Sequence, residues 1–143
     1  MIRSRFHIDK YGWTVTVFYA VTGIYVDDIL PELEDIGCRG ETLREAEAVV
    51  SSSRLDTGLT YSNNSLRRTV IVIAKTSSPK EFAKSWRHEM GHLADHIAMT
   101  FGIDPHGEEI QYIGDEIVEQ MWLVARDFLC EDCRDHRLRR HVK

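Results

Sequence analysis

The chain of 143 residues has few cysteines, few prolines and no surplus of positive charge. Three cysteines are an odd and small number, which excludes the disulfide framework that stabilises many small secreted domains. No apolar run is long enough to cross a membrane. Residues 1–6 lead into alternating residues and not into an apolar signal segment. We therefore expect a cytoplasmic protein without a membrane partner.

The charge balance also restricts the partners. The chain has 18 basic and 23 acidic residues, which gives a net charge of −5 and argues against nucleic acid as a partner. Its content of 43% hydrophobic and 29% charged residues is typical of a globular domain. The sequence thus predicts a single domain over residues 1–143, with a C-terminal tail from about residue 130.

Two pairs of segments have the composition of β-strands. Arg3–Asp9 and Trp13–Val21 alternate or are β-branched, and they predict a hairpin. Leu55–Ser62 and Ser65–Lys75 predict a second hairpin. Within it, Thr69–Ala74 is an almost continuous β-branched run, which indicates a strand buried on both faces.

Four segments have helical spacing, namely Asp27–Ile36, Thr42–Ser52, Pro79–Phe101 and Glu108–Leu129. The third has the strongest start signal, because Ser78 stands where an N-cap residue is expected and proline follows it. A short connector makes the last two helices antiparallel neighbours. We expect an α+β fold in which a small, mostly antiparallel sheet packs against these two helices.

The third helix contains His88-Glu89-Met90-Gly91-His92, an H-E-x-x-H motif. Two histidines four residues apart lie on one helix face, so both imidazoles can reach one metal ion. The glutamate then stands beside a metal-bound water as a general base. On a helical wheel, both histidines lie about 150° from the centre of the apolar stripe, so the helix can bury one side and present the motif on another.

A catalytic zinc ion usually takes a third protein ligand. The metzincin arrangement needs a glycine and a histidine where this chain has Asp95 and Ala98, so we expect a glutamate of the following helix. Glu109 lies at the edge of the buried face and is favoured. Glu116 shares that flank and lies nearer the axial level of the second motif histidine, whereas Glu108 points toward solvent.

Four other polar side chains are candidates for supporting roles. Asp95 and His96 follow the motif at positions from which they can orient a ligand imidazole or bind substrate. Tyr112 and Asp115 are candidates to support the metal ligands or to donate to an oxyanion. For all four, the polar side of an amphipathic helix is the alternative interpretation.

Several segments together resemble a known family. They are Thr57–Asn63, Val70–Ile73, the helix with the H-E-x-x-H motif, and Gly107–Tyr112. Across about residues 55–120, the chain resembles small metallopeptidase-like proteins of bacteria and their prophages, akin to the ImmA/IrrE and minimal gluzincin groups.

The resemblance implies a zinc-dependent metallopeptidase that hydrolyses peptide bonds of a peptide or protein substrate. It implies His88, His92 and Glu109 as the zinc ligands and Glu89 as the catalytic base. It also implies a minimal zincin-like fold in which an edge strand holds an extended peptide.

Two other interpretations fit the same residues. A zinc-stabilised interaction domain of the same fold would bind the metal without cleaving peptides. In a plain α+β domain, the motif would be a chance match on the surface, which a chain of this composition is expected to contain about 0.03 times.

The C-terminal residues Cys130, Cys133, His136 and His141 have a spacing that suits a second, structural metal site. A charged tail is the competing interpretation, because a single C-x-x-C is weak evidence for a metal. We expect Cys38 to be a lone thiol that is buried or half-buried.

Overall fold

The computed structural model describes residues 1–130, and these contain one four-stranded mixed sheet. The strands are β1 (Ile2–Ile8), β2 (Trp13–Val21), β3 (Gly58–Asn63) and β4 (Arg68–Ala74), in the spatial order β1-β2-β4-β3. Strands β1 and β2 are antiparallel, as are β3 and β4, while β2 and β4 run parallel. Each sequential pair is a predicted hairpin, and both hairpins are confirmed.

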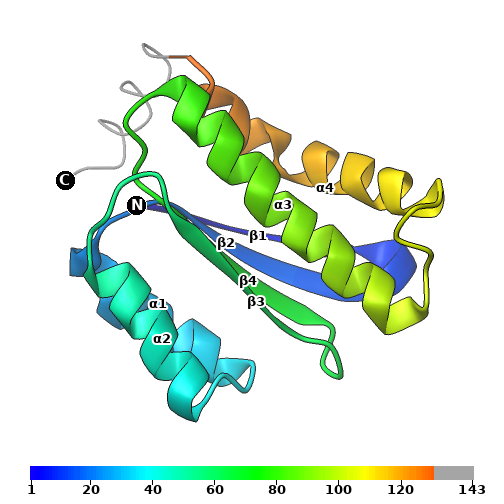
Figure 1. Cartoon of the computed structure of the whole chain (residues 1–143), viewed down its shortest axis with the longest axis horizontal. Coiled ribbons are helices and arrows are strands. Elements are labelled where there is room, and N and C mark those ends of the chain that lie inside the picture. Colours follow the sequence, from blue (N-terminus) through cyan, green and yellow to red (C-terminus); the bar gives the residue numbers. More distant parts are fainter. Residues whose placement is uncertain (131–143) are drawn as a thin grey trace.

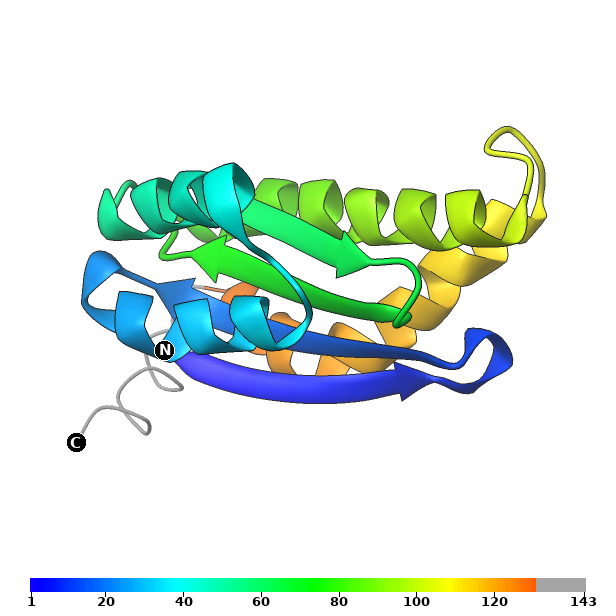
Figure 2. The same cartoon turned by 90° about the horizontal axis from the view of Figure 1, so that it is seen from below.

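Helices cover both faces of the sheet, so the domain has three layers (Figures 1 and 2). Helices α1 (Val26–Asp35) and α2 (Gly40–Ser51) lie on one face, and α3 (Pro79–Phe101) and α4 (Glu109–Ala125) lie on the other. Short 3-10 turns occupy Asp9–Tyr11, Gly23–Tyr25 and Arg126–Phe128. The expected α+β class is therefore confirmed.

The alternation of side chains along the strands creates two hydrophobic cores. On β4, Ile71 and Ile73 face α3 and α4, while Val70 and Val72 face α1 and α2. All four side chains are buried, as is Thr69. The prediction that this strand is buried on both faces is confirmed, and its continuous apolar run follows from helices packing on each side.

Helix α3 has the predicted bounds because both of its ends carry strong local signals. The Ser78 side chain accepts a hydrogen bond from the backbone N–H of Glu81 at 3.1 Å, and Pro79 occupies the first helical position. Gly102 ends the helix with φ +64°, and its N–H donates to the carbonyl of Ala98.

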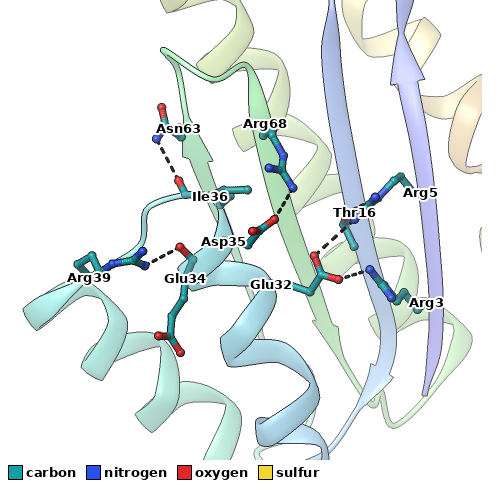
Figure 3. Close-up of polar contacts among 10 residues, drawn as sticks. All are labelled: Arg3, Arg5, Thr16, Glu32, Glu34, Asp35, Ile36, Arg39, Asn63 and Arg68. Atoms are coloured by element: carbon teal, nitrogen blue, oxygen red, sulfur yellow. Dashed lines mark hydrogen bonds and ion pairs between the residues drawn. The ribbon is translucent and has the colours of Figure 1, made fainter.

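Ion pairs fix α1 to the sheet (Figure 3). Glu32 accepts from Arg3 and from Arg5 of β1, and Asp35 lies 2.9 Å from Arg68 of β4. The contacts therefore reach from one edge strand to the centre of the sheet. They add to the apolar packing of α1 and α2 on the face of the sheet that α3 leaves free.

Three features differ from the sequence-based expectations. The parallel pairing of β2 with β4 was not foreseen, because it depends on a crossover through α1 and α2. Helix α2 begins at Gly40, two residues earlier than expected, and α4 ends at Ala125, where a 3-10 turn follows.

Within residues 1–130, no helix is both long and apolar enough to span a membrane. Of the C-terminal metal prediction, Cys133, His136 and His141 lie outside the described residues.

Candidate active site

The motif lies on the middle turns of α3. The apolar residues Phe82, Leu93 and Ile97 are buried against the sheet, whereas His88 and His92 are exposed. The helix therefore separates a core side from a histidine side, as the 100° spacing predicted. This placement leaves both imidazoles available to a ligand.

The two histidines converge on one point. The Nε2 atoms of His88 and His92 are 3.1 Å apart, and the ring centroids are 4.6 Å apart with the planes at 89°. In neutral imidazole, one ring nitrogen is a lone-pair donor to metals. Two such nitrogens at this distance can share one cation.

Glu89 points between α3 and the edge strand β3, and only 4% of its surface is exposed. The Thr60 hydroxyl of β3 donates to its Oε1 at 3.0 Å. Gly58, two residues earlier on the same strand, packs against the other oxygen, since a Cβ built there would lie 2.9 Å from Oε2. The carboxyl group is thus held by one strand from both sides.

This environment changes the acidity of Glu89. Burial raises the pKa of the carboxyl group above its ordinary value, while the Thr60 hydrogen bond and the charges of His88 and His92 lower it by less. A carboxylate with a raised pKa is a stronger base near neutral pH. Glu89 is therefore suited to take a proton from a water molecule.

An open cleft of about 460 Å³ runs beside these groups, between the first half of α3 and the start of β3. Its lining includes Gly58, His88 and Glu89, together with the basic side chains of Lys84 and Arg87. His88 and Glu89 thus border a space that a small ligand or peptide can enter.

A row of polar groups continues along the same flank of α3. The Ser62 hydroxyl lies 2.6 Å from Nδ1 of His96 and 2.7 Å from the Thr69 hydroxyl, which also accepts from Trp13 Nε1 at 2.8 Å. The His96 ring lies 6.3 Å from that of His92. Through this row, the sheet positions the histidine side of the helix.

The pKa of His96 is lowered, mainly by burial and also by the charge of His92, and Asp95 partly opposes this. A neutral His96 with a fixed Nδ1 partner is consistent with the predicted role of supporting a neighbouring imidazole. Asp95 itself is exposed and lines a different groove, between α3 and α4, together with Asp115. Tyr112 is 60% exposed on α4.

Sequence reasoning missed the contribution of β3. Gly58, Thr60 and Ser62 are small or polar and face α3, while Leu59 and Tyr61 pack into the other core. This period of two in Thr57–Asn63 was a usable signal for a strand with one polar face. The alternation does not indicate which helix packs on the polar face of this strand.

The glutamates of α4 lie elsewhere. Glu109 accepts a hydrogen bond from the Tyr11 hydroxyl at 2.9 Å and lies 3.6 Å from Lys10 Nζ, beside the β1–β2 turn. Glu116 lines a small pocket at that turn, and Glu108 is the exposed residue before the helix. The structure therefore does not bring these three carboxylates to the histidine pair.

Strand order explains this separation, because β1 and β3 form opposite edges of the sheet. Among residues 1–130, no group of three or more histidine, cysteine or acidic side chains is placed to hold a metal ion. The site that the described residues assemble consists of two converging imidazoles, a buried basic carboxyl group and an open cleft. No protein-family model, curated protein or solved structure matches this chain.

Proposed function

We propose that the chain is a zinc-dependent metallopeptidase in which His88 and His92 bind the metal and Glu89 is the general base. The observation that carries the proposal is the convergence of the two Nε2 atoms, 3.1 Å apart, beside a buried carboxyl group. Zinc–nitrogen bonds of about 2.0–2.1 Å place two ligand atoms of a tetrahedral ion about 3.4 Å apart. The imidazole pair fits two ligand positions after a small adjustment.

His88 and His92 would hold the zinc ion, which would supply Lewis-acid activation of a water molecule and of the scissile carbonyl. Glu89 would accept a proton from water and return it to the leaving amine. The Thr60 hydroxyl fixes Oε1, so the carboxylate has one defined orientation in both transfers. Its raised pKa, caused first by burial, favours the proton acceptance that begins the reaction.

Strand β3 is suited to align an extended peptide as substrate. It pairs with β4 along one edge, and its other edge is the border of the sheet. Backbone groups at such an edge can pair with an added strand. Because Gly58 and Thr60 contact Glu89, a peptide added to β3 passes directly beside the catalytic base.

The third ligand stays a prediction that no contact supports. For Glu109 to bind the metal, it would have to give up its hydrogen bond with Tyr11 and leave Lys10. The proposal therefore depends on His88, His92 and Glu89 and not on Glu109.

Hydrolysis of unstructured casein by the zinc-loaded full chain tests the proposal. We expect activity in the wild type and a loss of at least about 100-fold in Glu89→Gln, because the base is removed while both imidazoles remain. His88→Ala should lose both zinc and activity. Full activity of either variant, or of chelator-treated protein, would contradict the mechanism.

One observation favours a second candidate, a zinc-stabilised interaction domain that does not cleave peptides. Glu109 is engaged by Tyr11, and among residues 1–130 no third histidine, cysteine or acidic side chain joins the histidine pair in a group placed to hold a metal ion. This candidate predicts that zinc raises the melting temperature of the wild type while casein stays intact.

A further inference from the structure

The edge strand β3 has a second cleft on the face opposite to Glu89. This cleft has a volume of about 210 Å³ and lies between β3 and α2. Leu59 and Tyr61, which alternate with Gly58 and Thr60, contribute to its lining. The same stretch of strand therefore borders the proposed catalytic cleft on one face and this α2 cleft on the other.

The inner part of the α2 cleft is apolar. Cys38 is completely buried and Ala46 is nearly so, and Leu59 and Tyr61 pack on the same core. Val49 stands at the rim with 41% of its surface exposed. These side chains offer a hydrophobic surface to the methylene groups of a ligand.

A single carboxylate stands on the rim of this apolar surface. Glu45 of α2 is exposed and lines the cleft. Within the described part of the chain, no hydrogen bond or ion pair engages its carboxylate, whereas the neighbouring Glu41 is paired with Arg44 at 3.1 Å. The α2 cleft thus combines an apolar floor with an unpaired negative charge.

Lysine and arginine have the complementary chemistry, because a long methylene stem carries a positive head group. An acidic side chain would be repelled by Glu45, and a purely aliphatic one would leave that carboxylate without a partner. The charge and the apolar lining together therefore favour a basic side chain.

We propose that the α2 cleft binds a lysine or arginine side chain of an extended peptide that lies along β3. Side chains of a strand alternate between its faces, so this basic residue is the sequence neighbour of a residue that faces Glu89. The inference rests on the proposed binding of peptides at β3, and it defines a specificity subsite one position away from the catalytic face.

Peptide binding to the full-length Glu89→Gln protein tests the subsite without turnover. The probes are fluorescein-labelled octapeptides of alternating threonine and valine, with one lysine, glutamate or norleucine placed at each position in turn. Fluorescence anisotropy gives each dissociation constant. At one position of the peptide, or at positions i and i+2, the lysine peptide should bind about threefold to tenfold more tightly than the glutamate peptide. The norleucine peptide should have an intermediate affinity.

Charge reversal identifies the residue responsible. Adding Glu45→Lys should abolish or reverse the preference for lysine, and Glu45→Gln should reduce it. Glu47→Lys is the matched control, since Glu47 is an exposed residue of the same helix that does not line the cleft. The preference should persist in the control and decrease at high salt.

The outcomes separate this inference from the peptidase proposal. No binding of any peptide, no preference for lysine, or a preference that survives Glu45→Lys would overturn the subsite. Casein hydrolysis by the zinc-loaded wild type without a lysine preference would leave the peptidase intact and refute the subsite. Lysine-selective binding without casein hydrolysis would support the subsite and refute the peptidase proposal.

Discussion

Glu89 and Gly58 are in such close contact that a Cβ at position 58 would lie 2.9 Å from Oε2 of the glutamate. The same atom would lie 2.7 Å from the backbone carbonyl oxygen of Val72. The second contact involves backbone and cannot relax by a side-chain rotation. Strand β3 can therefore lie this close to both β4 and Glu89 of α3 only with glycine at this position.

Gly58→Ala should lower the free energy of unfolding by about 1–3 kcal/mol, because the added methyl group displaces either β3 or Glu89. Urea denaturation measures the change. Gly114→Ala is the control, since a Cβ on this α4 residue meets no atom within 4 Å. Alanine there should be neutral or stabilise the helix by up to about 1 kcal/mol. Equal stability of Gly58→Ala and the wild type would show that the strand does not approach so closely.

Glu89→Gln should stabilise the metal-free protein at neutral pH. The pKa of Glu89 is raised in the folded state, so its contribution to stability is fully present below the unfolded pKa of about 4.3 and is lost as pH rises through the folded pKa. Above the folded pKa, the buried charge costs stability that glutamine does not.

Thermal denaturation in the presence of a chelator measures this effect. The melting temperature of Glu89→Gln should exceed that of the wild type at pH 8, and the difference should shrink as pH falls toward 4. The exposed Glu47→Gln should show no such difference. A wild type that melts above Glu89→Gln at pH 8 would contradict the burial of this charge.

The contact between Tyr11 and Glu109 should be structural. Tyr11→Phe and Glu109→Gln should each lower the free energy of unfolding by about 0.5–1.5 kcal/mol, and the double variant should lose less than the sum. Zinc affinity, measured by competition with a chromogenic chelator, should change by less than about twofold in both. A loss of zinc affinity greater than tenfold in Glu109→Gln alone would instead identify Glu109 as the third ligand.

The Cys38 thiol should react slowly with a disulfide reagent. It is completely buried, and burial, together with the charge of Glu34, raises its pKa despite the opposing charge of Arg39. In a Cys130→Ser, Cys133→Ser background, we expect modification by Ellman's reagent only at the rate of local or global opening. Urea should accelerate the reaction to that of a free thiol. Rapid modification of the native protein would contradict the closed floor of the α2 cleft.

The sequence predicts those parts of the fold that depend on local signals. The cap at Ser78 and the glycine at 102 define α3 because both act within one helical turn. The parallel contact of β2 with β4 joins segments about 50 residues apart. Its formation depends on which face α1 and α2 cover, and no local residue pattern reports that choice.

In the candidate site, too, local spacing predicts some residue positions, and others depend on how the helices pack. The direction of His88 and His92 follows from helical spacing alone. The helical-wheel angle of Glu109 places it at the edge of the buried face of its own helix, but this angle does not say on which flank of α3 the next helix packs. Helix α4 packs on the side of β1, so Glu109 contacts Tyr11.

The zinc content of the full-length protein purified without chelators, compared with that of the His88→Ala, His92→Ala double variant, decides whether the histidine pair binds the metal. Elemental analysis should find one more equivalent of zinc per chain in the wild type than in the double variant, and Glu89→Gln should retain that equivalent. Equal zinc content in the wild type and the double variant would show that the histidine pair does not bind the metal.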